Sequence, residues 1–183
     1  MIITNKHKLA AIFLSYFIMS VALAKEVKFF TENNVPSAEE MADILLGTNE
    51  VNVTRAKTRS LSFGKAEKHS PVRIGLPIKF ERNSSSLNDN SIKYLKQLGL
   101  MLKLEKMSNK KIMLVGHTDA EGTEEYNQYL SEMRSSAVKE HLVSNYQVNT
   151  DVILTSGKGE AEILTGVSES ASMNRRVEIH LIR

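Results

Sequence analysis

Residues 111–142 read KIMLVGHTDAEGTEEYNQYLSEMRSSAVKEHL, and three patterns follow one another within them. Residues 112–116 are apolar and few enough to be a buried strand. The polar loop Gly116-His117-Thr118-Asp119 comes next, and residues from Thr123 to about Ser144 predict the longest helix of the chain. We expect Tyr126, Leu130, Met133, Ala137, His141 and Leu142 to lie on or near the inner stripe of that helix, with Tyr126 and His141 in the core or at the helix rim. Because loops at strand ends often bind ligands, the polar loop is the first candidate site.

The residues before this stretch predict a strand and a helix. Apolar and polar side chains alternate from Val72 to Phe80, which is typical of a half-buried strand. Pro77 cannot donate a ladder hydrogen bond, so it should lie at an edge or a strand margin. Residues 88–104 place Ile92, Leu95, Leu98 and Leu102 at helical spacing. A strand, a crossing helix and a second strand favour a right-handed β-α-β unit.

The residues after this stretch predict two more strands. Residues 151–156 form a short β-like segment, and residues 176–183 alternate Val177, Ile179 and Leu181 with polar partners. The element order is therefore β-α-β-α-β-β over residues 74–183. We expect an α+β sandwich in which helices pack on one face of a mixed sheet.

Residues 1–24 have the pattern of a signal peptide. Lys6 and Lys8 precede an apolar run of 15 residues, 9–23, and the small residues Ala22 and Ala24 precede a charged pair. We expect export to the periplasm and cleavage after Ala24. An uncleaved membrane anchor is the alternative, but a spanning helix needs about 20 apolar residues.

Two further segments lie between the signal and the main domain. Residues 25–50 form an N-terminal arm with a short helix at 36–47, capped by Ser37 and ended by Gly47. Because about three turns are marginal alone, its apolar face should dock on the main domain or on a partner. Residues 51–73 form a basic linker, either solvated or in contact with an anionic surface.

Composition excludes several classes of site. The chain has no cysteine, so it has no disulfide, no thiolate zinc site and no lipid on an N-terminal cysteine. The net charge is +3, but residues 25–183 carry 22 basic against 21 acidic residues. The sequence pI near 9.0 therefore does not indicate nucleic-acid binding. His117, Asp119 and His141 lack a known metal spacing, so we expect no metal and no cofactor.

The long helix places Asn127, Ser131 and Arg134 on one face, at spacings of four and three. With Asp119 at the mouth of the loop, Arg134 would form a dipolar clamp for a ligand that bears both an ammonium and a carboxylate. The alternative is that Asp119 and Arg134 form a plain salt bridge or a helix cap.

Several motifs together resemble the OmpA C-terminal domain family, which includes peptidoglycan-associated lipoproteins and the periplasmic part of flagellar stators. The resemblance covers roughly residues 74–183. The matching residues are Gly116-His117-Thr118-Asp119, Gly122, Tyr126-Asn127, Leu130-Ser131, Arg134, Ala137-Val138, Gly157, Gly159 and Asn174-Arg175-Arg176-Val177-Glu178-Ile179. The chain departs from the family pattern at Phe80-Glu81-Arg82-Asn83 and at Ser85, along one expected wall of the pocket.

The resemblance implies a non-enzymatic domain that binds peptidoglycan noncovalently through the diaminopimelate of the stem peptide. It implies that Asp119 contacts the amine or the backbone of the ligand and that Arg134 grips a diaminopimelate carboxylate. It also places Thr118 and Asn127 in the pocket, with Arg175 or Arg176 flanking it.

The attached segments decide which kind of family member to expect. There is too little chain before residue 74 for an outer-membrane barrel, no lipoprotein cysteine, and no acidic residue at 9–24 for a stator helix. We expect a soluble periplasmic or outer-membrane-associated protein that tethers an envelope partner, bound by residues 25–73, to the cell wall. The alternatives are a protein adaptor in a secretion or motility assembly and, less favoured, a cell-wall-modifying enzyme.

Overall fold

The computed structural model describes residues 27–48 and 73–182 of the 183-residue chain. The predicted signal peptide and all but the last residue of the predicted basic linker lie outside the described residues. Within the described ranges, no helix is both long and apolar enough to cross a membrane.

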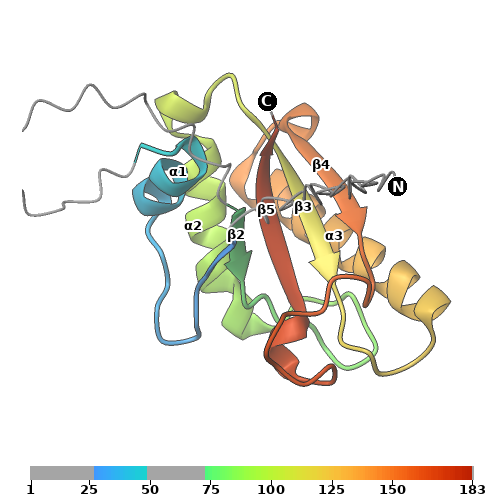
Figure 1. The fold of residues 1–183 in the computed structure, drawn as a ribbon. Coiled ribbons are helices and arrows are strands. Elements are labelled where there is room, and N and C mark those ends of the chain that lie inside the picture. The colour runs from blue at the N-terminus through green and yellow to red at the C-terminus, as the bar shows by residue number, and fades with distance from the viewer. Residues whose placement is uncertain (1–26, 49–72, 183) are drawn as a thin grey trace, which may run out of the picture.

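A mixed five-stranded sheet forms the centre of the described part of the chain (Figure 1). Its strands are β1 (Val27–Phe29), β2 (Arg73–Leu76), β3 (Lys111–His117), β4 (Ile153–Gly157) and β5 (Arg176–Ile182). The spatial order is β1-β2-β5-β3-β4, with β5 antiparallel to both β2 and β3. The last strand therefore lies between β2 and β3, which run parallel to each other without being neighbours. The expected mixed sheet is confirmed.

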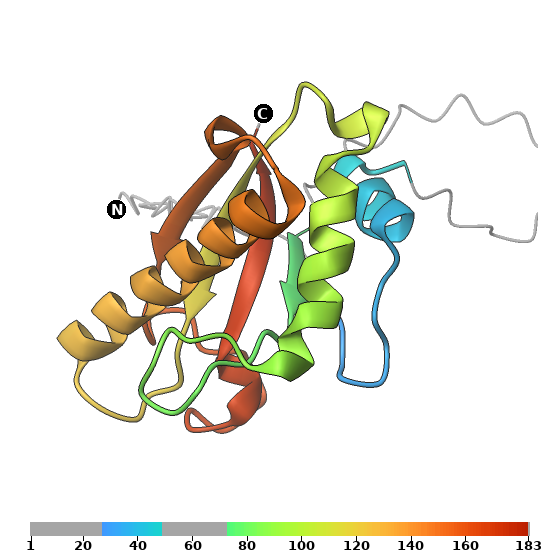
Figure 2. The ribbon, with the colours of Figure 1, turned by 180° about the vertical axis from the view of Figure 1, so that it is seen from behind.

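Helices cover one face of this sheet. They are α1 (Ala38–Leu46), α2 (Ile92–Leu102) and α3 (Glu124–Tyr146), and Figure 2 shows α2 and α3 in front of the strands. Helix α3 begins where the sequence predicts it, because the Thr123 side chain accepts a hydrogen bond of 3.2 Å from the Tyr126 N–H. The α+β class with helices on one face is confirmed.

The first predicted strand is shorter than its alternating pattern. Strand β2 ends at Leu76, directly before Pro77, and Phe80 makes only an isolated bridge with Leu87. A proline has no N–H to continue the ladder, so the prediction that Pro77 marks a strand margin is correct, whereas a strand that continues to Phe80 is wrong.

The described part of the N-terminal arm, residues 27–48, packs into the same core. Strand β1 pairs with β2 in parallel, and α1 packs on α2. Ser37 caps α1 and Gly47 ends it at a φ of 71°, as expected. Met41 and Leu45 are buried. Residues 27–48 are thus part of the folded domain. The domain, rather than a partner, covers the apolar face of α1. A helix of nine residues is marginally stable alone, so it depends on this packing.

Helix α3 lies unusually close to the end of β3 and β4. A Cβ added to Gly116 would lie 2.2 Å from the Ser131 carbonyl oxygen, and one added to Gly157 would lie 2.3 Å from Ser131 Oγ. The same hydroxyl accepts a 2.9 Å hydrogen bond from the Gly159 N–H. This seam of small residues fixes the rotation of α3 against the sheet.

The rotation corrects the predicted inner stripe of α3. Of the residues expected on or near that stripe, Leu130 and Leu142 are buried, whereas Tyr126 and Met133 are each 41% exposed. The buried residues are Asn127, Leu130, Ser131, Arg134, Ser135, Val138 and Leu142. Polar side chains face inward here because glycines on the sheet leave room for small residues, and because one end of the helix borders a cavity rather than the apolar core.

Candidate functional site

The candidate site lies at the end of the sheet where β3 ends and β5 begins (Figure 1). A cavity of about 400 Å³ opens there, within the range of small-ligand sites. Five of the six residues predicted from the sequence line it: Thr118, Asp119, Asn127, Arg134 and Arg175. They come from the loop after β3, from the first half of α3, and from the residue before β5.

Asp119 forms an ion pair with Arg175 rather than with Arg134. The Arg175 guanidinium contacts Asp119 Oδ2, while Oδ1 has only a long contact of 3.4 Å from the Glu121 N–H. The Asp119 side chain is 8% exposed and that of Arg175 is 46% exposed. The carboxylate is therefore a fixed, nearly buried acceptor, and its partner arginine reaches in from solvent.

Arg134 is a buried cation without a carboxylate partner among the described residues. It is 7% exposed, and its Nε donates a 3.1 Å hydrogen bond to the Ser84 carbonyl oxygen. Its guanidinium lies 5.0 Å from the centre of the Phe80 ring. Burial, followed by the nearby charge of Arg175, lowers the pKa of Arg134, although an arginine remains charged. The sequence-based alternative of a plain Asp119–Arg134 salt bridge is not what the structure has.

Asn127 and Thr118 hold the loop in place. The Asn127 amide nitrogen lies 3.2 Å from the Asp119 carbonyl oxygen and 3.1 Å from that of Glu121, and it also contacts the Glu160 carboxylate. The Thr118 N–H donates to the Gly159 carbonyl oxygen, whereas its buried Oγ1 has no hydrogen-bond partner among the described residues. Thr118 lines the cavity with its hydroxyl buried in the wall.

Arg176, the sixth predicted residue, is not at this cavity. Its guanidinium is bound to the buried carboxylate of Glu178, at 2.7 Å and 2.8 Å, and to the Glu162 carbonyl oxygen at 3.2 Å. Successive side chains of a strand point to opposite faces, so Arg176 turns to the face of the sheet away from the helices. Arg175, one residue earlier, precedes the strand and points into the site.

Arg176 belongs to a second polar cluster on that face. Burial opposes ionisation of Glu178, but His180, His117 and Arg176 hold its pKa down to about 2. Burial and the charge of Arg176 lower the pKa of His117 to about 4. His117 is therefore a neutral histidine that packs beneath the loop.

The cavity is also lined by residues outside the six predicted site residues, and one of them, Phe80, lies on the pocket wall that the sequence analysis expected. Tyr126 lines it from the exposed rim of α3, and Phe80 lines it from the extension of β2. The departures from the family pattern fall on the same wall: Glu81 lines the cavity and accepts a 2.9 Å hydrogen bond from Asn88, whereas Ser85 does not line it. The sequence signal for Phe80 was its position at the end of an alternating run of apolar and polar residues.

Charges of both signs line the cavity in equal number. They are Arg82, Arg134, Arg175, Glu81, Asp119 and Glu121. Among them, Asp119 and Arg134 are the two most deeply buried, and no carboxylate of the described residues lies within ion-pair distance of Arg134. Such a cavity suits a ligand that carries both an ammonium and a carboxylate.

Residues 79–176 match the family model described as the OmpA family. The chain belongs to the OmpA family. The matched residues cover more than half of its length and include every residue of the cavity.

Two curated proteins of Pseudomonas aeruginosa illustrate the relationship. The peptidoglycan-associated lipoprotein is 33% identical over 117 residues, which cover 63% of this chain and 68% of the lipoprotein. Outer membrane porin F is 36% identical over 109 residues, or 58% of this chain and 31% of the porin. The chain thus spans about a third of the length of the porin F relative, and a similar share of an outer membrane protein A of Bordetella avium.

Solved structures of OmpA-family domains have the same fold. The OmpA-like domain of FopA1 from Francisella tularensis aligns with a TM-score of 0.51 at 25% identity, covering 58% of this chain and 69% of that one. The peptidoglycan-associated lipoprotein from Burkholderia pseudomallei aligns with a TM-score of 0.50 at 29% identity, covering 57% of this chain and 88% of that one.

Proposed function

We propose that this OmpA-family domain binds peptidoglycan noncovalently, through the diaminopimelate of the stem peptide. The observation that carries the proposal is Arg134, a buried guanidinium that borders a cavity and has no carboxylate partner among the described residues. Burying a charge is costly unless it is paired, so a folded protein that keeps one at a cavity is built to pair it with a ligand. The name of the relatives, peptidoglycan-associated lipoprotein, agrees with this ligand.

The side chain of diaminopimelate ends in an ammonium and a carboxylate on one carbon. The carboxylate would pair with Arg134, and the ammonium would approach Asp119 from the Oδ1 side, which Arg175 leaves free. The buried Thr118 hydroxyl has no partner among the described residues and would bond the ligand only after a small movement of the cavity wall. Asn127 acts by holding the loop that carries Asp119.

The cellular role we propose is that of a tether in the periplasm or at the outer membrane. Export by the signal peptide would bring the domain to the cell wall, and an envelope partner would bind outside the cavity. Because α1 is packed into the domain, such a partner would contact residues 49–72 or the outer surface of residues 27–48. A protein adaptor that does not bind the cell wall is the alternative, and loss of wall binding would favour it.

We propose that the domain is not an enzyme. The chain has no cysteine nucleophile, and the described residues contain no cluster of three metal-ligating side chains. Neither ring nitrogen of His117 is hydrogen-bonded to a described residue. Among the described residues, His117 therefore has no hydroxyl nucleophile in place that it could activate as a general base.

A pelleting experiment tests the proposal. Insoluble diaminopimelate-type peptidoglycan is mixed with the purified protein, with Asp119→Ala and with Arg134→Ala, and circular dichroism verifies that each variant is folded. We expect the unmodified protein to pellet and both variants to remain in solution, because breaking a buried charged contact costs at least about thirty-fold in affinity. An unmodified protein that remains in solution would refute peptidoglycan binding.

A further inference from the structure

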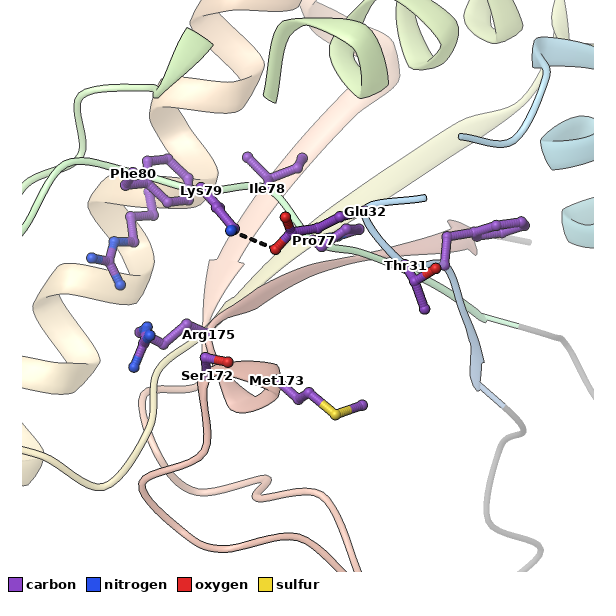
Figure 3. A pocket seen from close by; sticks show the side chains of 11 residues that line it. Thr31, Glu32, Pro77, Ile78, Lys79, Phe80, Ser172, Met173 and Arg175 are labelled. Carbon is purple, nitrogen blue, oxygen red and sulfur yellow. Dashed lines mark ion pairs between the residues drawn. The ribbon is translucent and has the colours of Figure 1, made fainter. Parts of the chain in front are cut away.

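A second cavity, of about 360 Å³, adjoins the first. The two cavities share Phe80, Arg134 and Arg175, so these three side chains form a common wall. The rest of the second cavity comes from three segments: residues 30–32 after β1, residues 77–79 after β2, and the turn at residues 172–173. Figure 3 shows Lys79 and Glu32 on one side of this space and Ser172, Met173 and Arg175 on the other.

The lining of the second cavity is mainly apolar, with charge at two places. Phe30, Pro77, Ile78 and Met173 supply apolar surface. Lys79 and Glu32 neutralise each other in an ion pair at the side, and the common wall presents the guanidinium groups of Arg134 and Arg175. A ligand that fits would therefore have small apolar groups next to a carboxylate.

We propose that the second cavity binds the residues that follow diaminopimelate in the stem peptide, which are alanines that end in a free carboxylate. This proposal rests on the proposed function, because it extends a ligand held at the first cavity across the common wall. The alanine methyl groups would contact the apolar side chains, and the terminal carboxylate would face a guanidinium of the common wall. A stem peptide without these alanines would leave the second cavity empty.

The N-terminal segment gives this cavity its closed side. Phe30, Thr31 and Glu32 lie outside the span of the family match, which begins at residue 79. They are held there by pairing of β1 with β2 and by the hydrogen bond from the Tyr94 hydroxyl to the Thr31 carbonyl oxygen, at 3.0 Å. Packing of residues 27–48 on the domain therefore builds a binding wall as well as stabilising the fold.

Calorimetric titration with soluble stem peptides tests the proposal. The two ligands are a tripeptide that ends in diaminopimelate and the pentapeptide that carries two further alanines. We expect the unmodified protein to bind the pentapeptide roughly tenfold more tightly, from the burial of two methyl groups. Ser172→Trp, which fills the second cavity from an exposed position, should reduce pentapeptide affinity to that of the tripeptide and leave tripeptide affinity unchanged.

Two further variants keep the result interpretable. Thr31→Trp fills the same cavity from the opposite side and should have the same effect. Ser170→Trp is the matched control, because Ser170 is exposed on the same loop and lines neither cavity. The proposal for the second cavity would be wrong if the unmodified protein bound the two peptides equally, or if both filling variants still preferred the pentapeptide. Either result would leave the proposal for the first cavity unaffected. Failure of the tripeptide to bind at all would instead refute the proposed function.

Discussion

Replacing Arg134 with methionine should stabilise the folded protein and abolish its binding to peptidoglycan. In the structure Arg134 is 7% exposed, and its guanidinium has no carboxylate partner among the described residues. If Arg134 supports the fold, the substitution should lower the free energy of unfolding. If Arg134 serves a ligand, the substitution should raise it, so the sign of the change distinguishes the two roles.

The magnitude follows from the contacts of the side chain. Methionine loses the hydrogen bond to the Ser84 carbonyl oxygen, which contributes about 1.5 to 3 kcal/mol, and the stacking on Phe80, which contributes about 0.5 to 2 kcal/mol. It removes a desolvation cost of several kcal/mol per buried ion and the repulsion from Arg175, which exceeds the attraction of Asp119, and it adds apolar surface to the same space. We expect a net gain of about 1 kcal/mol in the free energy of unfolding, or roughly 4 °C in Tm.

Urea denaturation measures the free energy of unfolding, and pelleting with insoluble peptidoglycan measures binding. Lys139→Met is the matched control, because it removes a positive charge from the same helix but lines neither of the two cavities. We expect the control to pellet like the unmodified protein. If Arg134→Met lowers the free energy of unfolding by more than about 1 kcal/mol, the guanidinium supports the fold and the inference from its missing partner is wrong.

Three other predictions concern the fold around the site. Gly116→Ala should destabilise the protein by about 1 to 3 kcal/mol in urea denaturation, because the new methyl group would overlap the Ser131 carbonyl oxygen; an unchanged midpoint would mean that α3 does not rest on β3 as described. Leu45→Ala should cost about 2 to 5 kcal/mol in the same assay, and a cost near zero would show that α1 is not part of the core. Stability should also fall as the pH decreases. The pKa of His117 is lowered from 6.5 to about 4, so the unfolded chain takes up a proton that the folded chain does not, and roughly 3 kcal/mol is lost between those two values. The pKa of Glu178 is lowered from 4.5 to about 2, which adds a further loss over that lower range. Denaturation midpoints measured from pH 7 to 3 test this, and His117→Gln should flatten the first part of the fall.

The packing of residues 27–48 on the domain bears on the proposed role of the protein as a tether. The first cavity lies at the end of the sheet where β3 ends and β5 begins, whereas α1 lies on α2, toward the end of β5 (Figure 1). If the domain binds peptidoglycan as proposed, the ligand would not cover the ion pairs of α1 with Lys106, because none of these residues lines either cavity. A ligand and a partner could be held at the same time, as a tether requires.

The sequence by itself determined the elements that depend on local patterns. The apolar run of β3, the Thr123 cap of α3 and the alternation of β5 each appear in the structure near the expected residues. It also placed Asp119 at the exit of β3 and Arg134 on the same face of α3 as Asn127, since helical spacing alone fixes that relation.

Only the tertiary structure decided which surfaces meet. The rotation of α3 depends on contacts between Gly116, Gly157 and Ser131, which are distant in sequence, so periodicity placed Leu130 and Leu142 correctly but not Met133. The choice of Arg175 over Arg176 depends on the residue at which β5 begins, because one position reverses the direction of a strand side chain. Arg134 has no ion-pair partner among the described residues because Asp119 is paired with Arg175. Pairing of charges is settled by distances in space, and a linear sequence does not contain them.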